Sequence, residues 1–422
     1  MENLKKKIYP FQFEPMTDEY AWGKETWILA DLGFRDSAIA NGWLAGNTIG
    51  DVMETYLERI VGEEVYNFYG RQFPVMIKRI EVAGNYGLYV CPDDIVAEER
   101  YDALGKKKLW YVLDAQEDAR IYLGLKQDIS ARDLYEHSKD GAILEDVNEI
   151  VPEVGQHYEI DPGLIHGMSG HLTVVEIAES SNMDLKLYDW GVDPASCEED
   201  LVSAIDFVDL DKYCHCHWDP DYHCECHHDH EEGCHCHDHE EDDCCCHHDH
   251  EEGCHCHDHE EEDDCCCGHD AVKKMTEILL EGVEFTTTGL KLTDPIHIYT
   301  EKFTSFILYY CVKGEAALQV RREEADGDQD IIHVPTDFYV LKEGEAVLVP
   351  GESPDFILSP READTYLLET ILDHREIPDE YINPGKEDEP VDEDDEEDDS
   401  IFPGMPHPKT PLDPMTPGPF VN

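Results

Sequence analysis

A tandem repeat from His227 to Cys267 separates two parts of the chain that can form hydrophobic cores. Its two copies, HHDHEEGCHCHDHEEDDCCC and HHDHEEGCHCHDHEEEDDCCC, follow each other directly and contain no aliphatic side chain. Without apolar surface to bury, a segment cannot offset the entropy lost when its backbone is ordered. We therefore expect residues 214–269 to be a disordered insertion, with the folded parts of the protein before and after it.

Both flanking parts have the pattern of β-sheet proteins, with short runs rich in β-branched and aromatic residues separated by turn residues. The predicted strands include 73–82, 109–115 and 172–179 before the insertion and 305–320, 338–358 and 365–372 after it. Apolar residues at three- and four-residue spacing predict helices over 48–62 and 130–141. A short linker helix is expected between 199 and 213, and the acidic run 386–400 begins a tail that we expect to be disordered.

Each β-rich part contains one turn that is typical of cupin barrels. In GQHYEIDPGLIHG (155–167), a Gly, a short strand and a Pro-Gly turn precede His166, and this is how a cupin presents a histidine inside its barrel. EGEAVLVPGESPDF (343–356) has the same layout, with Asp355 about where a ligand His would fall. Two such units predict an all-β double cupin, that is, two jelly-roll-like barrels with short helices.

Motifs in a fixed order run through both parts of the chain. The first part contains YPFQFEP, AWGKETW, ANGWLAGNTIGDVMETY, FPVMIKRIE, VCPDD, GKKKLWYVLDA, DPGLIHGM and LKLYDWG, and the second contains EFTTTGLKLT, CVKGEAAL and LKEGEAVLVP. In this order they resemble the type I mannose-6-phosphate isomerases in their short bacterial form. The resemblance covers roughly 300 residues and leaves out the insertion and the tail.

This resemblance implies a division of the chain into four parts. We expect an isomerase-like catalytic cupin over 1–195 and a C-terminal cupin over 271–385. Between them, 196–270 holds the linker helix and the Cys/His/acidic repeats, and 386–422 is the acidic and Pro-rich tail.

The resemblance also implies a metal site, usually for zinc, whose ligands are largely substituted in this chain. In the family, the ligands are a Gln and a His in Q-V-H-P-D-D, a Glu in G-K-T-E-x-W-Y, and the His of the Pro-Gly turn. Here YVCPDD has Tyr89 and Cys91 at the first two positions, GKKKLWY has Lys108 at the third, and only His166 matches. Cys91 and His166 are therefore the predicted barrel ligands of zinc or another divalent transition metal.

What the resemblance implies about activity is an aldose–ketose isomerase that interconverts mannose 6-phosphate and fructose 6-phosphate. In such an enzyme the metal polarises the carbonyl while a base moves a proton between adjacent carbons through an enediol. Lys186, in DLKLYDWG, stands at the family's catalytic Arg, and Lys106 retains the Lys of G-K-T-E. We predict catalytic roles for Lys186 and Lys108, and substrate binding by Lys106 and Tyr89.

Three versions of the chemistry remain open because the ligands are altered. A different metal geometry could recruit Tyr89 or His171, or the Lys108 ammonium could itself supply positive charge near the carbonyl. In the third version, a non-catalytic cupin binds a sugar phosphate without turning it over.

The insertion is predicted to bind metal by itself, since closely spaced thiolates and imidazoles suit zinc, nickel, copper or cobalt. Sixteen His and fourteen Cys lie between Cys214 and His269. The predicted ligands there are Cys214, Cys216, Cys224, Cys226, Cys234, His235, Cys236, His237, Cys254, His255, Cys256 and His257. A long insertion at a linker costs little free energy, so the segment is either a metal storage or delivery element or a tolerated expansion.

The net charge of −67 argues against nucleic acid and anionic membranes as partners, because both would repel the chain. The first residues lack the apolar stretch of a secretory signal, and apolar runs such as 306–312 have only strand length. We expect a cytoplasmic protein, in which 17 cysteines favour thiols and metal ligation over disulfides. The expected partners are a sugar phosphate and transition-metal ions, and the family precedent favours a monomer.

Overall fold

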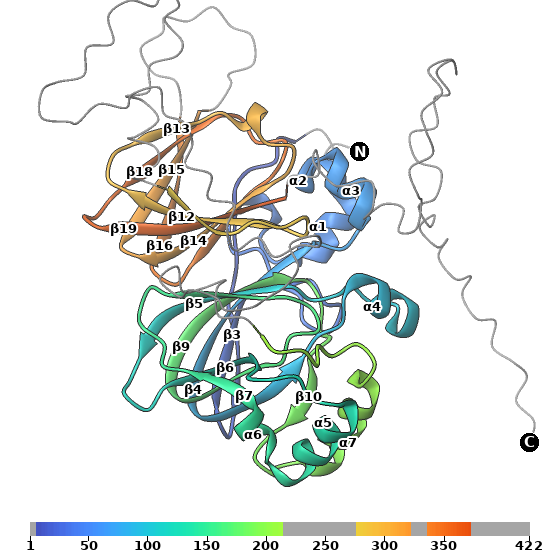
Figure 1. Cartoon of the computed structure of the whole chain (residues 1–422). Helices are drawn as coiled ribbons and strands as arrows, with labels where there is room; N and C mark the ends of the chain where they lie inside the picture. Colours follow the sequence, from blue (N-terminus) through green and yellow to red (C-terminus); the bar gives the residue numbers. More distant parts are fainter. Residues whose placement is uncertain (1–5, 214–275, 322–335, 373–422) are drawn as a thin grey trace, which may run out of the picture.

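The computed structural model of the chain describes residues 6–213, 276–321 and 336–372. These residues form two sheet-rich parts, whose strands are coloured blue to green in the first and, apart from one N-terminal strand, yellow to red in the second (Figure 1). The predicted disorder of the insertion and of the tail concerns residues outside the described ranges. No helix within the described residues is long and apolar enough to cross a membrane.

The first part is a nine-stranded sheet built around two long antiparallel strands, β4 (Val75–Val90) and β9 (His166–Glu179). Val75 pairs with Glu179 at one end of this pair, and Tyr89 pairs with His166 at the other. The remaining strands are β2 (Met16–Tyr20), β3 (Gly23–Leu29), β5 (Lys108–Ala115), β6 (Arg120–Leu125), β7 (Val147–Ile150), β8 (His157–Ile160) and β10 (Leu185–Tyr188). Strand β10 extends the sheet by pairing with the His166 end of β4.

The second part contains two sheets. The six-stranded sheet has the order β1 (Phe11–Gln12), β17 (Ala346–Val349), β14 (Ile307–Lys313), β19 (Thr365–Ile371), β12 (Thr286–Leu292), β11 (Thr276–Leu280). The four-stranded sheet has the order β13 (Ile296–Ile298), β18 (Phe356–Pro360), β15 (Glu315–Arg321), β16 (Thr336–Lys342). The architecture is thus mostly sheet in two barrels, and the predicted all-β double cupin is confirmed.

Short helices lie on the barrels, as the spacing predicts. They are α1 (Ile49–Tyr56), α2 (Glu58–Val61), α3 (Glu63–Tyr69), α4 (Asp94–Tyr101), α5 (Ala131–Asp140), α6 (Ile143–Asp146) and α7 (Pro194–Ala204). The predicted helix 48–62 is broken between α1 and α2 at Leu57, whose φ of 52° is incompatible with a continuous helix. The linker helix begins earlier than expected because Asp193 caps the backbone N–H of Ser196 and Pro194 occupies the first turn.

One hydrophobic core joins the two barrels. It contains Phe73 of the first barrel and Phe306 of the second, whose ring centroids lie 4.7 Å apart. The N-terminal strand β1 also belongs to the second barrel, since Phe11 pairs with Leu348 of β17. Each barrel has its own inner cluster as well, around Trp110 in the first and Tyr309 in the second. The two parts therefore share buried apolar surface.

Candidate functional site

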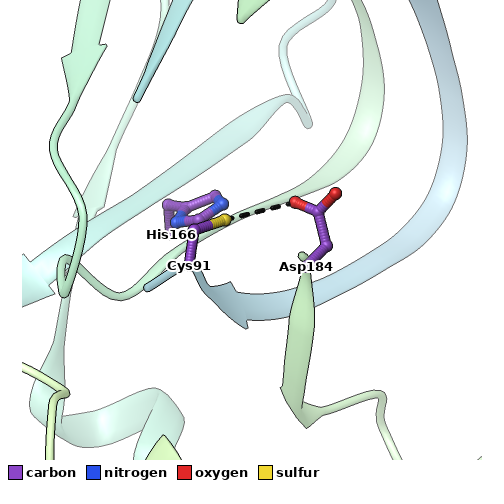
Figure 2. Close-up of side chains that lie close together, drawn as sticks. All are labelled: Cys91, His166 and Asp184. Atoms are coloured by element: carbon purple, nitrogen blue, oxygen red, sulfur yellow. Dashed lines mark hydrogen bonds between the residues drawn. The ribbon is translucent and has the colours of Figure 1, made fainter. Parts of the chain in front are cut away.

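Three neighbouring strands bring Cys91, His166 and Asp184 together at one end of the first barrel (Figure 2). Cys91 directly follows β4, His166 begins β9, and Asp184 directly precedes β10. The registers Tyr89–His166 and Leu185–Val90 place the three residues side by side. Their ligand atoms all lie within 4.8 Å of one another, and the Cys91 thiol donates to Asp184 Oδ1 at 3.4 Å. We call these three residues the barrel triad.

The barrel triad offers one sulfur, one nitrogen and one oxygen donor, and this combination suits zinc and other divalent transition metals. The prediction of a divalent metal is confirmed in that the first barrel contains a group of side chains that fits one. Sequence reasoning paired Cys91 with His166 but missed Asp184. Asp184 directly precedes β10, and only the pairing of β10 with β4, which the sequence does not show, brings it to the other two residues.

Lys108, the first residue of β5, extends its ammonium group into the barrel triad. Its Nζ lies 2.9 Å from His166 Nε2 and forms an ion pair with Asp184 Oδ1. The side chain is only 1% exposed. Burial is the largest single effect and opposes the charge, but Asp184 together with smaller contributions from Cys91 and Glu176 raises the pKa of Lys108 above its ordinary value. Lys108 is therefore a buried ammonium in contact with two of the three triad side chains.

The contacts of His166 define its protonation state. Its Nδ1 lies 2.8 Å from the carbonyl oxygen of Leu164, which can only accept, so Nδ1 carries the hydrogen. Nε2 then has the single lone pair of the ring and accepts from Lys108. Burial, followed by the charge of Lys108, lowers the pKa of His166 to about 3. At neutral pH this imidazole is an uncharged acceptor.

Lys106 is a second buried ammonium at the same carboxylate, and it forms an ion pair with Asp184 Oδ2. Burial alone would raise the pKa of Asp184, but Lys106 and Lys108 together hold it well below its ordinary value. Two ammonium groups thus share one ionised carboxylate. We call Lys106, Lys108 and Asp184 the outer group, and its net charge is +1.

A second group of buried charges, the inner group, consists of Lys78, Glu25 and Glu176. Lys78 Nζ is 2.9 Å from Glu25 Oε1 and 3.3 Å from Glu176 Oε1, and the indole N–H of Trp110 donates to Glu176 Oε2 at 2.7 Å. Burial would raise the pKa of Glu176, but the charges of Lys78 and Lys108 lower it to about 2. This inner group has one cation for two carboxylates, so its excess charge is negative. The positive end of the combined network is the end at the barrel triad.

Tyr89 and Lys186 are paired across β4 and β10 beside Asp184. Lys186 Nζ lies 5.9 Å from the centroid of the Tyr89 ring and 3.9 Å from Asp189 Oδ2. The side chain of Lys186 is 28% exposed and that of Asp184 is 22% exposed, whereas Cys91 and His166 are buried. Asp184 and Lys186 therefore form the solvent-facing side of the site.

Two other residues singled out by the sequence lie away from the barrel triad. His171 Nδ1 is 2.8 Å from Asp118 Oδ2 on the surface, and its position within β9 faces Ala83. The idea that His171 could become a barrel ligand is therefore wrong. In the second barrel, Asp355 accepts from the backbone N–H of Thr300 at 2.9 Å. Among the described residues, the barrel triad is the one group that could hold a metal ion.

The predicted ligands of the insertion lie outside the described residues. They are Cys214, Cys216, Cys224, Cys226, Cys234, His235, Cys236, His237, Cys254, His255, Cys256 and His257. Their metal binding stays a prediction.

No family model matches the chain. It is 25% identical over 205 residues to the Bacillus subtilis protein named "Probable mannose-6-phosphate isomerase GmuF", a match that covers 43% of this chain and 62% of that protein. It is 24% identical over 200 residues to Mannose-6-phosphate isomerase ManA of Bacillus subtilis, covering 43% of this chain and 61% of that protein. The chain thus spans about three-fifths of the length of these curated relatives.

Solved structures resemble this one over most of the chain. The crystal structure of the mannose 6-phosphate isomerase from Bacillus subtilis superposes with a TM-score of 0.60 at 17% identity, covering 86% of this chain and 99% of that chain. A zinc-bound mannose 6-phosphate isomerase has a TM-score of 0.56 at 12% identity, covering 86% of this chain and 100% of that chain. At these identities the likeness establishes the shared double-cupin fold.

Proposed function

Because the chain resembles the type I mannose-6-phosphate isomerases in sequence and fold, we propose that it is a sugar-phosphate aldose–ketose isomerase. Its first candidate reaction is the interconversion of mannose 6-phosphate and fructose 6-phosphate. The observation that carries this proposal is the buried cationic centre that Lys106, Lys108 and the barrel triad form at one end of the first barrel.

Such a centre meets the main electrostatic demand of the reaction. Moving a proton between adjacent carbons through an enediol develops negative charge on the substrate oxygen. A preorganised positive charge in a water-poor site stabilises that oxygen more than water does. The ammonium groups of Lys106 and Lys108 are held in place by Asp184 and provide such a charge.

We assign the remaining roles by position. Cys91, His166 and Asp184 have the donor set for a divalent metal, which would polarise a carbonyl if it were bound there in place of the Lys108 ammonium. Lys186 and Tyr89 lie on the solvent-facing side, where the ammonium of Lys186 can bind a phosphate or hydroxyl oxygen.

The full chain is tested by a coupled assay that follows fructose 6-phosphate formed from mannose 6-phosphate. We expect turnover by the wild type and a loss of roughly 100-fold in kcat/KM for Lys186→Met, the size expected when one charged group leaves a reaction site. Lys24→Met is the matched control, because Lys24 forms an exposed ion pair with Glu81 at 3.2 Å. It should retain wild-type activity.

Calorimetric binding of mannose 6-phosphate separates the alternatives when no turnover occurs. Saturable binding without turnover would support the non-catalytic sugar-phosphate-binding cupin. Absence of both would contradict the isomerase proposal and direct attention to metal storage or delivery by the insertion.

We also propose a cellular compartment, the classes of partner that the protein avoids, and an oligomeric state. The three cysteines of the described residues, Cys91, Cys197 and Cys311, are free thiols, which supports a reducing compartment such as the cytoplasm. The net charge of −67 supports a chain that avoids nucleic acid and anionic membranes. We expect a monomer.

A further inference from the structure

Lys108 and a divalent metal would use the same atoms of the barrel triad. The hydrogen on His166 Nδ1 is donated to Leu164, so Nε2 has the ring's single available lone pair. That lone pair accepts from Lys108 Nζ at 2.9 Å. Asp184 Oδ1, the oxygen that accepts from the thiol of Cys91, is paired with the same Nζ. A metal ligated by Nε2 therefore requires the Lys108 ammonium to leave.

Metal–ligand distances lead to the same conclusion. Zinc binds imidazole nitrogen and carboxylate oxygen at about 2 Å and thiolate sulfur at about 2.3 Å. An ion held at those distances by three atoms that lie within 4.8 Å of one another would occupy the space between them. The buried ammonium contacts two of these atoms. Both cations cannot fit, and their charges repel each other.

We propose that the Lys108 ammonium is the resident cation of the first barrel and that it takes the position a divalent metal would take among Cys91, His166 and Asp184. This inference rests on the proposed isomerase function for its catalytic part, in which Lys108 donates to the substrate oxygen that becomes negative. An ammonium has three N–H donors, and His166 and Asp184 accept from two of them. The third N–H is the one that serves the substrate.

The charge distribution fits a ligand-binding cation better than a closed structural ion pair. A structural pair matches one cation to one anion, whereas Lys106 and Lys108 share Asp184 alone. The excess positive charge lies beside the partly exposed carboxylate of Asp184, and the excess negative charge lies at the inner group around Lys78. An anionic oxygen entering past Asp184 therefore meets the positive end of the network.

The test must locate bound zinc rather than count it, because the insertion contains many other thiols and imidazoles. Crystals of the full chain are soaked in zinc, and anomalous difference maps are calculated at the zinc edge for the wild type, Lys108→Glu, Lys108→Gln and the control Lys24→Gln. We expect no peak among Cys91, His166 and Asp184 in the wild type and the control. In both Lys108 variants the lone pair of Nε2 is free, so a peak is expected there.

Two results of this experiment would overturn the proposal. One is a zinc peak at the barrel triad of the wild type, and the other is the absence of a peak in crystals of Lys108→Gln. Lys108→Gln is included because its side chain is uncharged and shorter, so the test survives a failure of Lys108→Glu to fold.

Turnover after exhaustive chelation separates this inference from the proposed function. A resident ammonium predicts that wild-type turnover stays within about twofold after chelation, while Lys108→Gln loses roughly 100-fold or more. Turnover that disappears on chelation overturns the inference and leaves the isomerase proposal standing. An empty triad with no turnover before or after chelation overturns the isomerase proposal, and it supports Lys108 as the resident cation of a binding site.

Discussion

At the residue scale, Lys78 is the cation on which two buried carboxylates depend. Its side chain is 3% exposed, and it forms ion pairs with Glu25 and Glu176. Lys78→Met would leave both carboxylates without their counter-ion, and breaking a buried pair in this way costs about 3–5 kcal/mol. We expect the free energy of unfolding, measured by urea denaturation at pH 7, to fall by that amount.

Lys24→Met is the control for this prediction, since Lys24 pairs with Glu81 while 43% exposed. Exposed ion pairs contribute about 0–1 kcal/mol, so this variant should remain close to the wild type. Equal losses in the two variants would mean that burial of Lys78 does not decide its contribution.

A second prediction at the residue scale concerns Asp31 and the pH dependence of the unfolding free energy. Burial raises its pKa from 3.8 to about 6, against the hydrogen bond from the backbone N–H of Phe73. The folded state therefore holds the proton more tightly than the unfolded state. The resulting stabilisation is complete below pH 3.8 and is lost as the pH rises through about 6. Asp31→Asn removes this dependence.

Urea denaturation of the wild type and Asp31→Asn at pH 4 and pH 7 checks the sign. From pH 4 to pH 7, the unfolding free energy of the wild type should fall by about 2–3 kcal/mol relative to that of Asp31→Asn. A difference that stays constant with pH, or moves towards the wild type, would contradict the assigned shift.

At the element scale, the close approach of β4 and β9 beside His166 depends on a glycine. A Cβ on Gly167 would lie 2.2 Å from the carbonyl oxygen of Gly87 and 2.8 Å from Leu88 Cδ2. Gly167→Ala must therefore separate the strands where they present the barrel triad. We expect a loss of about 1–3 kcal/mol in unfolding free energy, the usual cost of overpacking, measured by urea denaturation.

Gly84→Ala is the matched control on the same strand pair. A Cβ at Gly84 would meet nothing closer than 3.5 Å, from Trp22. It should change stability by less than about 1 kcal/mol. If Gly84→Ala costs as much as Gly167→Ala, the loss reflects glycine in a strand and not the close approach at the triad.

Local patterns predicted most elements, and where they misplaced a boundary the reason is a local contact. Ser130 and Asp133 form the capping box that begins α5, as expected for the pattern at 130–141. The linker helix was misplaced because its apolar spacing at 199–213 is weaker than the cap of Asp193 and Pro194 before it. In the structure, both helices begin at a capping residue.

At the scale of the whole molecule, the contact between Phe73 and Phe306 joins the two barrels in one core. Phe306→Ala would leave a cavity at this junction, at a cost of about 3–5 kcal/mol. We expect calorimetry to show a lower Tm and a broader transition, because the barrels then unfold less cooperatively. Phe338→Ala, at a side chain that is 62% exposed, should leave the transition unchanged. A single sharp transition at the wild-type Tm in Phe306→Ala would contradict a shared core.

The sequence by itself determined the strands of the double cupin and the turn that presents His166, because strand alternation and turn residues are local properties. The nearness of Cys91 to His166 was implied by the resemblance to the isomerase family. The resemblance placed Lys108 at the same site, but the sequence could not reveal Asp184 as a neighbour or the contact of Lys108 with His166 and Asp184. Lys108 pairs with Ala178 in the backbone register, far along β9 from His166, and only the closure of the barrel brings Nζ to Nε2. Which side chains meet across a barrel interior depends on sheet curvature and side-chain direction, and which charges stay paired depends on burial. Both properties arise only in the tertiary structure.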